Sequence, residues 1–167
     1  VHEAGGRDLL ILVSEDGASC VYIAARHGDF EVLRWLHEAC GRDLLMLVKE
    51  NGTSCAYIAA QHGHLAVLRW LHEACGRDLL MLVREDGASC AYIAAQNGHL
   101  DVLRLLHEAC GRDVLMLVKE NGTSCAYIAA QNGHLDVLRW LHEACGRDLL
   151  MLVGEDGKSC AWTAAQN

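Results

Sequence analysis

Cysteine and histidine are the residues of this chain that could do chemistry, and the cysteines recur at a fixed interval of 35 residues. A pair such as His72 and Cys75 lies three positions apart, so on a helix both side chains would share a face. Zinc, however, requires a full tetrahedral set of ligands, and Gly5 stands where the other units have the second cysteine. We therefore predict no metal and no cofactor, and interpret the cysteines as small buried or helix-terminal residues. They form two columns: Cys20, Cys55, Cys90, Cys125 and Cys160, and Cys40, Cys75, Cys110 and Cys145.

Disulfides along one column are excluded by distance. Packed helices of neighbouring units lie roughly 8 to 10 Å apart, whereas bridged Cα atoms lie about 4.4 to 6.8 Å apart. Bridges between the two columns remain open. The triplets at Asn51 and Asn121 match a glycosylation acceptor, but the other units carry Asp-Gly at the same place, so turn formation explains all of them.

Catalysis is the next chemistry to consider, because Ser54 and Cys55 lie near His62 and His64 in the sequence. Each of these residues has counterparts in the neighbouring units, whereas an active site usually breaks the symmetry of a repeat. No residues unique to one unit gather into a constellation. We predict that the chain is not an enzyme.

A column of tryptophans, Trp35, Trp70 and Trp140, could stack a flat ligand. In the third unit Leu105 takes this position without changes in its neighbours. We therefore interpret the column as core packing.

The elements that must position these residues follow from an internal repeat. The motif Gly-Arg-Asp begins at Gly6, Gly41, Gly76, Gly111 and Gly146, a period of 35 residues. We predict one array over residues 1–167, made of units 6–40, 41–75, 76–110 and 111–145, a partial unit 146–167, and residues 1–5 as the end of a preceding unit.

The sequence pattern of each unit predicts a pair of helices. Ser54 can cap a short helix over residues 55–61, and Gly63 supplies a left-handed residue after it. Residues 65–74 have apolar side chains at three- and four-residue spacings, typical of an amphipathic helix that faces the core. The apolar segment 44–48 and the turn Asn51-Gly52 then form an extended or short helical finger.

The composition of the chain limits the kinds of partner that it can bind. The chain has 167 residues, of which 52% are hydrophobic, and a net charge of -8, so it is globular and poorly suited to bind nucleic acid. Aliphatic runs such as residues 9–13 are far shorter than the roughly 18 residues that cross a bilayer, so no membrane insertion is expected.

The segment G-T-S-C-A-Y-I-A-A-Q-N-G-H-L-D-V-L-R-W-L resembles an ankyrin repeat, although Ser-Cys-Ala-Tyr replaces the family's Thr-Pro-Leu-His and the unit is longer. The resemblance implies an all-α-dominated, ankyrin-like helical solenoid with hairpin or short helical fingers between units. It also implies a non-enzymatic scaffold that binds a protein partner on its concave surface. Together with the odd number of cysteines, it favours reduced thiols and a cytoplasmic location.

The resemblance places the contacts on either side of the turn glycine and after the paired alanines, where the units also vary most. These positions are Asp16, Ala18, Arg26, His27, Asn51, Thr53, Gln61, His62, Asp86, Ala88, Gln96, Asn97, Asn121, Thr123, Gln131 and Asn132. Free drift of exposed residues would explain the same variation.

A structural array is the alternative function. The chain starts in a second helix and stops in a first one, and Trp162 would be exposed where terminal units normally become polar. Such end faces favour head-to-tail self-association of the array.

Overall fold

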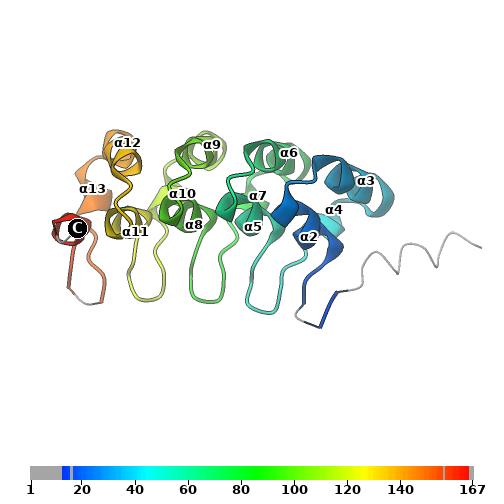
Figure 1. The fold of residues 1–167 in the computed structure, drawn as a ribbon, viewed down its shortest axis with the longest axis horizontal. Coiled ribbons are helices and arrows are strands. Elements are labelled where there is room, and N and C mark those ends of the chain that lie inside the picture. The colour runs from blue at the N-terminus through cyan, green and yellow to red at the C-terminus, as the bar shows by residue number, and fades with distance from the viewer. Residues whose placement is uncertain (1–12, 16, 156, 166–167) are drawn as a thin grey trace, which may run out of the picture.

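The computed structural model describes residues 13–15, 17–155 and 157–165 of the chain. In this part of the chain the helices of successive units stack side by side into an elongated solenoid with two helical layers, and a row of loops projects from it (Figure 1). Where the structure is described, β pairing consists of isolated bridges at the base of these loops. The predicted helical solenoid is confirmed.

Short helices that begin directly after a serine form the inner layer. The side chain of Ser54 accepts a hydrogen bond from the backbone N–H of Tyr57 at 3.1 Å, as an N-cap does. The chain leaves the helix through Gly63, whose φ is 71°. Ala59 and Ala60 are fully buried, and their small side chains let the helices pack closely. The inner helices are α2 (Cys20–His27), α5 (Cys55–Gln61), α8 (Cys90–Gln96), α11 (Cys125–Gln131) and α14 (Cys160–Ala164).

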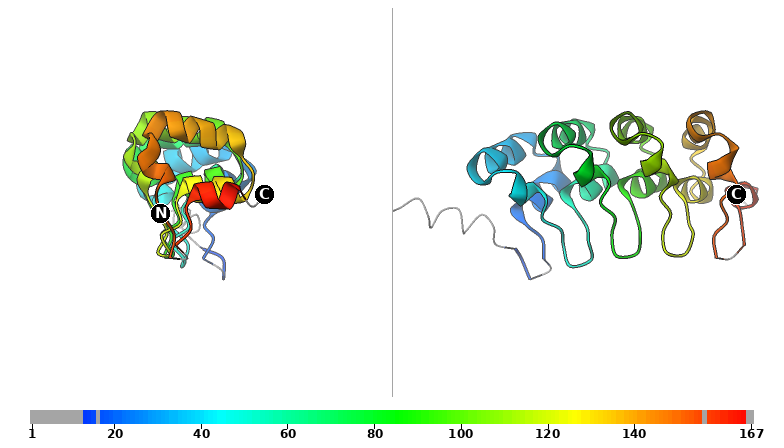
Figure 2. Two further views of the ribbon diagram at one scale, coloured as in Figure 1. Left: turned by 90° about the vertical axis from the view of Figure 1, so that its left-hand side faces the viewer. Right: turned by 180° about the vertical axis from the view of Figure 1, so that it is seen from behind.

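Longer amphipathic helices form the outer layer (Figure 2). Leu68 and Leu71 are fully buried against the inner layer, whereas Arg69 and Glu73 are exposed on the opposite face. The spacing of the leucines thus marks the buried side of the helix, as the sequence predicts. The outer helices are α3 (Phe30–Cys40), α6 (Leu65–Cys75), α9 (Leu100–Cys110) and α12 (Leu135–Cys145).

A one-turn helix follows each outer helix and begins at the arginine or the aspartate of the Gly-Arg-Asp motif. Arg42 donates a hydrogen bond to the carbonyl oxygen of Cys75, the last residue of α6, at 2.8 Å, and lies 3.8 Å from the carboxylate of Asp78. Arg112 repeats the contact with Cys145 at 2.9 Å. The arginine of one unit therefore satisfies a terminal carbonyl of the next outer helix. The short helices are α4 (Arg42–Leu45), α7 (Arg77–Leu80), α10 (Asp113–Met116) and α13 (Arg147–Leu150).

A hairpin-like finger connects each short helix to the next inner helix. Val48 and Ser54 form an antiparallel bridge, and the N–H of Gly52 donates to the carbonyl oxygen of Lys49 at 2.8 Å. Gly52 has a φ of 78°, which explains why glycine occupies this turn. Both alternatives for the finger segment therefore occur, because Leu44 and Leu45 are helical and residues 48–54 form a hairpin.

A histidine at the start of each later outer helix joins neighbouring units. Nε2 of His64 lies 3.0 Å from the carbonyl oxygen of Arg26, and His134 makes the same contact with Gln96 at 3.0 Å. A Cβ added to Gly28 would lie 2.8 Å from the ring of His64, so this glycine makes room for the imidazole. This histidine column is a structural link between units.

The tryptophan column lies on the outer helices, and its interpretation as core packing is wrong for Trp35, which is 55% exposed. Trp70 and Trp140 are half-buried at the surface of the stack. The ring of Trp70 meets the edge of Phe30 at 5.8 Å between centroids, and the ring of Trp140 meets that of His107 at 5.9 Å. Trp70 and Trp140 therefore pack against both the preceding outer helix and the edge of the core, and Leu105 in the same column is buried in the core.

Candidate functional site

The fingers and the inner helices form two adjoining surfaces along the length of the solenoid. The fingers project from the N-terminal ends of the inner helices, away from the outer layer (Figure 2). Side chains from finger tips, inner helices and the following finger line common pockets, for example Asn121, Gln131 and Glu155. A groove therefore runs between the two surfaces.

Backbone hydrogen bonds between fingers hold one wall of this groove. The N–H of Glu85 donates to the carbonyl oxygen of Asn51 at 3.1 Å, and the same bond joins Glu155 to Asn121 at 2.9 Å. Because the bonds use only main-chain atoms, side chains at the tips can differ without loss of this wall.

Most of the positions expected to bind a partner have accessible side chains in this groove. Asp16 lies outside the described residues. The exposed or half-buried ones are Arg26, His27, Asn51, Gln61, His62, Asp86, Gln96, Asn97, Asn121, Gln131 and Asn132.

Four of the expected positions are buried at the base of the fingers: Ala18, Thr53, Ala88 and Thr123. The hydroxyl of Thr53 donates to the side-chain oxygen of Asn51 at 2.6 Å, so it supports the turn. Ala88 and Thr123 still line pockets of the groove. The role of all these residues in binding stays a prediction.

The residue before the turn glycine holds the tip of the second, third and fourth fingers. Oδ1 of Asn51 accepts the backbone N–H of Thr53 at 3.1 Å, and Oδ1 of Asp86 accepts that of Ala88 at 3.2 Å. This shared geometry explains why asparagine and aspartate alternate here, as in other Asx turns. The Asn-Gly-Thr triplets thus have the same turn role as the Asp-Gly units, as predicted.

The chemistry of the groove changes along its length at the ends of the inner helices. Arg26 and His27 are exposed in the first unit, and the ring of His62 stacks on that of His64 with centroids 5.9 Å apart. Partial burial, together with His64 and Arg26, lowers the pKa of His62 below its ordinary value. Later units carry neutral amides instead, and Asn132 donates to the carbonyl oxygen of Gln96 at 2.8 Å. The groove is therefore cationic and imidazole-rich at one end and amide-rich at the other.

Tyrosines and basic residues line the groove beside these positions, and sequence reasoning missed their relationship. Arg84 lies over the ring of Tyr57, 5.4 Å from its centroid. Lys119 Nζ lies 2.8 Å from Oδ2 of Asp86, and this hydrogen bond raises the pKa of Lys119. Partial burial alone would raise the pKa of Asp86, but the bonds from Lys119 and from the Ala88 N–H lower it. The signal in the sequence is a constant spacing of 27 residues from tyrosine to base.

The cysteines are free thiols, and they are placed by packing. The thiol of Cys55 donates to the carbonyl oxygen of Leu45 at 3.2 Å, and that of Cys125 donates to Leu115 at 3.2 Å. Burial raises the pKa of Cys90 and of Cys125 to about 12. Cys55, Cys125 and Cys160 of the first column thus donate to carbonyl oxygens near the ends of the short helices.

Three residues that were considered for catalysis make structural contacts instead. The side chain of Ser54 caps α5, the thiol of Cys55 is buried, and His64 is bonded to a backbone carbonyl. Across the residues that the structure describes, no group of three or more His, Cys, Asp or Glu side chains could hold a metal ion. In the same residues, no helix has the length and apolar character needed to span a bilayer.

Stacked helix pairs with projecting fingers define a helical repeat protein with a continuous groove. A family model described as ankyrin repeats (3 copies) matches residues 58–153, and another described as ankyrin repeats (many copies) matches residues 21–72. The chain belongs to the ankyrin repeat family. No curated protein was found to match it. Ankyrin repeats are generally non-enzymatic scaffolds for protein–protein interaction.

Proposed function

We propose that this chain is a non-enzymatic scaffold that binds a protein partner along the groove between its fingers and inner helices. The observation that carries the proposal is that, within each unit, one set of residues holds the stack and another set is accessible in the groove. Contacts such as Arg42 to Cys75 and His64 to Arg26 recur and hold the stack, whereas accessible groove side chains such as His62 and Asn97 differ between units. A rigid frame with variable, accessible polar side chains is what specific recognition requires.

The residues proposed to contact the partner are those expected from the sequence that have accessible side chains, from Arg26 to Asn132. The array would act as one body, because histidine contacts, backbone bonds between fingers, or both link each described unit to the next. Nine free thiols, several of them buried, also fit a reducing compartment such as the cytoplasm.

A quantitative pull-down with matched variants tests this function. The groove variant carries Gln61→Ala, His62→Ala, Gln96→Ala and Gln131→Ala, and the control variant carries Arg69→Ala, Glu73→Ala, Arg104→Ala and Glu108→Ala on the outer helices. All eight side chains are accessible, so neither set empties the core.

We expect a protein that is retained by the wild type and the outer-helix variant but lost from the groove variant. Calorimetry with that purified protein should then show at least a tenfold weaker affinity for the groove variant. Equal retention by the groove variant, or loss only from the outer-helix variant, would contradict the proposed surface.

Self-association is the second candidate, because large apolar side chains of the last two described units are exposed. Leu135 is 56% exposed, Met151 is 70% exposed and Trp162 is 44% exposed, whereas the methionines equivalent to Met151 are half-buried. A further repeat unit, from a second copy or from a longer array, would cover these side chains. Light scattering against concentration tests it: head-to-tail oligomers support self-association, and a monomer at high concentration contradicts it.

A further inference from the structure

A basic residue at the base of a finger lies over the tyrosine of the preceding unit, and this contact recurs along the groove. The positive charge approaches the face of the aromatic ring, as in a cation–π interaction. The distances to the ring centroids are 4.9 Å for Lys49 over Tyr22, 5.4 Å for Arg84 over Tyr57, and 5.2 Å for Lys119 over Tyr92.

The fifth unit keeps the backbone of this arrangement but has Gly154 at the basic position. The N–H of Gly154 donates to the carbonyl oxygen of Lys158 at 3.2 Å, as the N–H of Lys119 does to Thr123 at 3.0 Å. Gly154 lies outside the left-handed region of φ, so the turn itself does not require a glycine here. The difference from the other units is the missing side chain.

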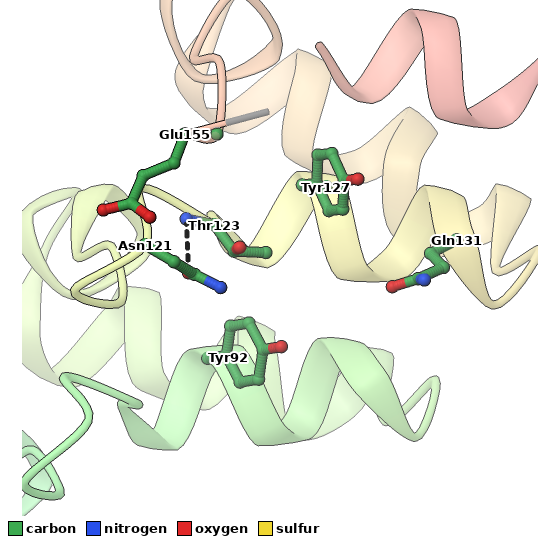
Figure 3. A pocket seen from close by; sticks show the side chains of 7 residues that line it. Tyr92, Asn121, Thr123, Tyr127, Gln131 and Glu155 are labelled. Carbon is green, nitrogen blue, oxygen red and sulfur yellow. Dashed lines mark hydrogen bonds between the residues drawn. The ribbon is translucent and has the colours of Figure 1, made fainter. Parts of the chain in front are cut away.

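A pocket of about 540 Å³ lies at this place, against about 290 Å³ for the corresponding pocket one unit earlier. Arg84 and Lys119 line the smaller pocket, whereas no basic side chain lines the larger one. Figure 3 shows the rings and polar side chains around the larger pocket, which is lined by Tyr92, Asn121, Thr123, Tyr127, Gln131, Gly154 and Glu155.

The lining of this pocket suits a cation. It combines the carboxylate of Glu155, the amides of Asn121 and Gln131, and the two tyrosine rings. One unit earlier, Lys119 Nζ lies near both the ring of Tyr92 and the carboxylate of Asp86. In the larger pocket the side-chain amide of Asn121 takes the place of Asp86, and the carboxylate comes from Glu155 instead. The charge of Glu155 would repel an anion at this place.

We propose that this pocket binds a lysine or arginine side chain of the protein partner, in the position that Lys49, Arg84 and Lys119 take in the preceding units. The proposal rests on the proposed function and names one anchor of the partner. A basic side chain seated between aromatic rings in a groove is a common kind of binding hot spot.

The test is a titration of protein labelled with ¹³C in its tyrosine rings, of which the chain has four. The probe is N-acetylarginine N-methylamide, and the matched neutral probe is N-acetylcitrulline N-methylamide, both at constant ionic strength. We expect the arginine probe to shift the Tyr127 and Tyr92 signals with saturation in the millimolar range. Tyr22 and Tyr57 should not move, and the neutral probe should bind at least tenfold more weakly.

Gly154→Lys introduces the residue that the second and fourth units have here, so we expect it to fold and to weaken the arginine probe at least tenfold. Gly154→Ser keeps most of the space and should bind within about twofold of the wild type. Equal binding of both probes, equal shifts at all four tyrosines, unchanged binding by Gly154→Lys, or loss in Gly154→Ser would overturn the proposal.

The pull-down separates this proposal from the proposed function. If the groove variant loses a partner that Gly154→Lys retains at full affinity, the scaffold function stands and the cation pocket is wrong. If no partner depends on the groove but the arginine probe still binds only the wild type and Gly154→Ser, the pocket exists and the proposed function is wrong.

Discussion

Nε2 of His99 lies 3.0 Å from the carbonyl oxygen of Gln61 in the preceding unit. The imidazole reaches this carbonyl across Gly63, where an added Cβ would lie 2.9 Å from Nδ1 of the ring. Gly63, which ends one inner helix, thus also makes room for His99 of the next unit. Stability of the stack should depend on this pair more than on histidines that face the groove.

Replacing His99 with alanine should lower the free energy of unfolding by about 1 to 3 kcal/mol, because a carbonyl loses its donor and the ring leaves a gap. Urea denaturation followed by circular dichroism measures this change. His62→Ala is the control, because His62 is exposed, and should change the stability by less than about 0.5 kcal/mol. Equal effects of the two substitutions would contradict the role of His99.

Gly63 and Gly133 occupy the same position in their units, with φ of 71° and 74°, but only Gly63 has a neighbouring ring within 4 Å. Gly133→Ala should therefore cost about 1 kcal/mol through backbone strain alone. Gly63→Ala should cost at least about 1 kcal/mol more, because the histidine must move. Thermal unfolding of both variants measures the difference, and identical midpoints would show that the ring adjusts freely.

Alkaline conditions should destabilise the array through its buried thiols. The pKa of Cys90 and of Cys125 is raised from 9.0 to about 12, so the folded state holds these protons more tightly than the unfolded state. The free energy of unfolding should therefore be unaffected by them below pH 9.0 and should fall as the pH rises toward about 12.

Each buried thiol should contribute roughly 1 kcal/mol of this loss per pH unit. Urea denaturation at several pH values checks the slope, with Cys90→Ala combined with Cys125→Ala as the control. The double variant should lose less stability between pH 9.0 and pH 11 than the wild type. Parallel curves would show that other groups cause the alkaline loss.

Alkylation rates should follow the burial of the thiols. Cys20 is half-buried, whereas Cys90 and Cys125 are fully buried and stay protonated at pH 8. Iodoacetamide should therefore modify Cys20 at least tenfold faster in the folded chain. The tryptic peptides that contain these three cysteines differ in sequence, so mass spectrometry can follow each one. Rates that are equal before denaturation would contradict the packing of the first cysteine column.

The local part of the fold could be predicted from the sequence. The capping role of Ser54, the turn at Gly63 and the buried stripe of the outer helix depend on residues within a few positions of each other. Helix-capping signals and hydrophobic periodicity reflect interactions between residues that are close in the sequence. The helix pair and the repeat were therefore predictable.

Contacts between residues about one period apart were not predictable in the same way. His64 and Arg42 have partners 38 and 33 residues away, and those partners are backbone carbonyls, which leave no mark in the sequence. The exposure of Trp35 depends on how neighbouring outer helices pack, which hydrophobicity does not reveal. The spacing of 27 residues from tyrosine to base was visible, but its meaning needed the stacked units.

The contact of Arg42 with Cys75 spans 33 residues and recurs between Arg112 and Cys145 over the same distance. Loss or duplication of one whole period would return every arginine to an equivalent carbonyl, whereas a deletion of a few residues would misalign all later units. The number of units in this chain can therefore change in evolution in single steps that leave no side chain without its counterpart.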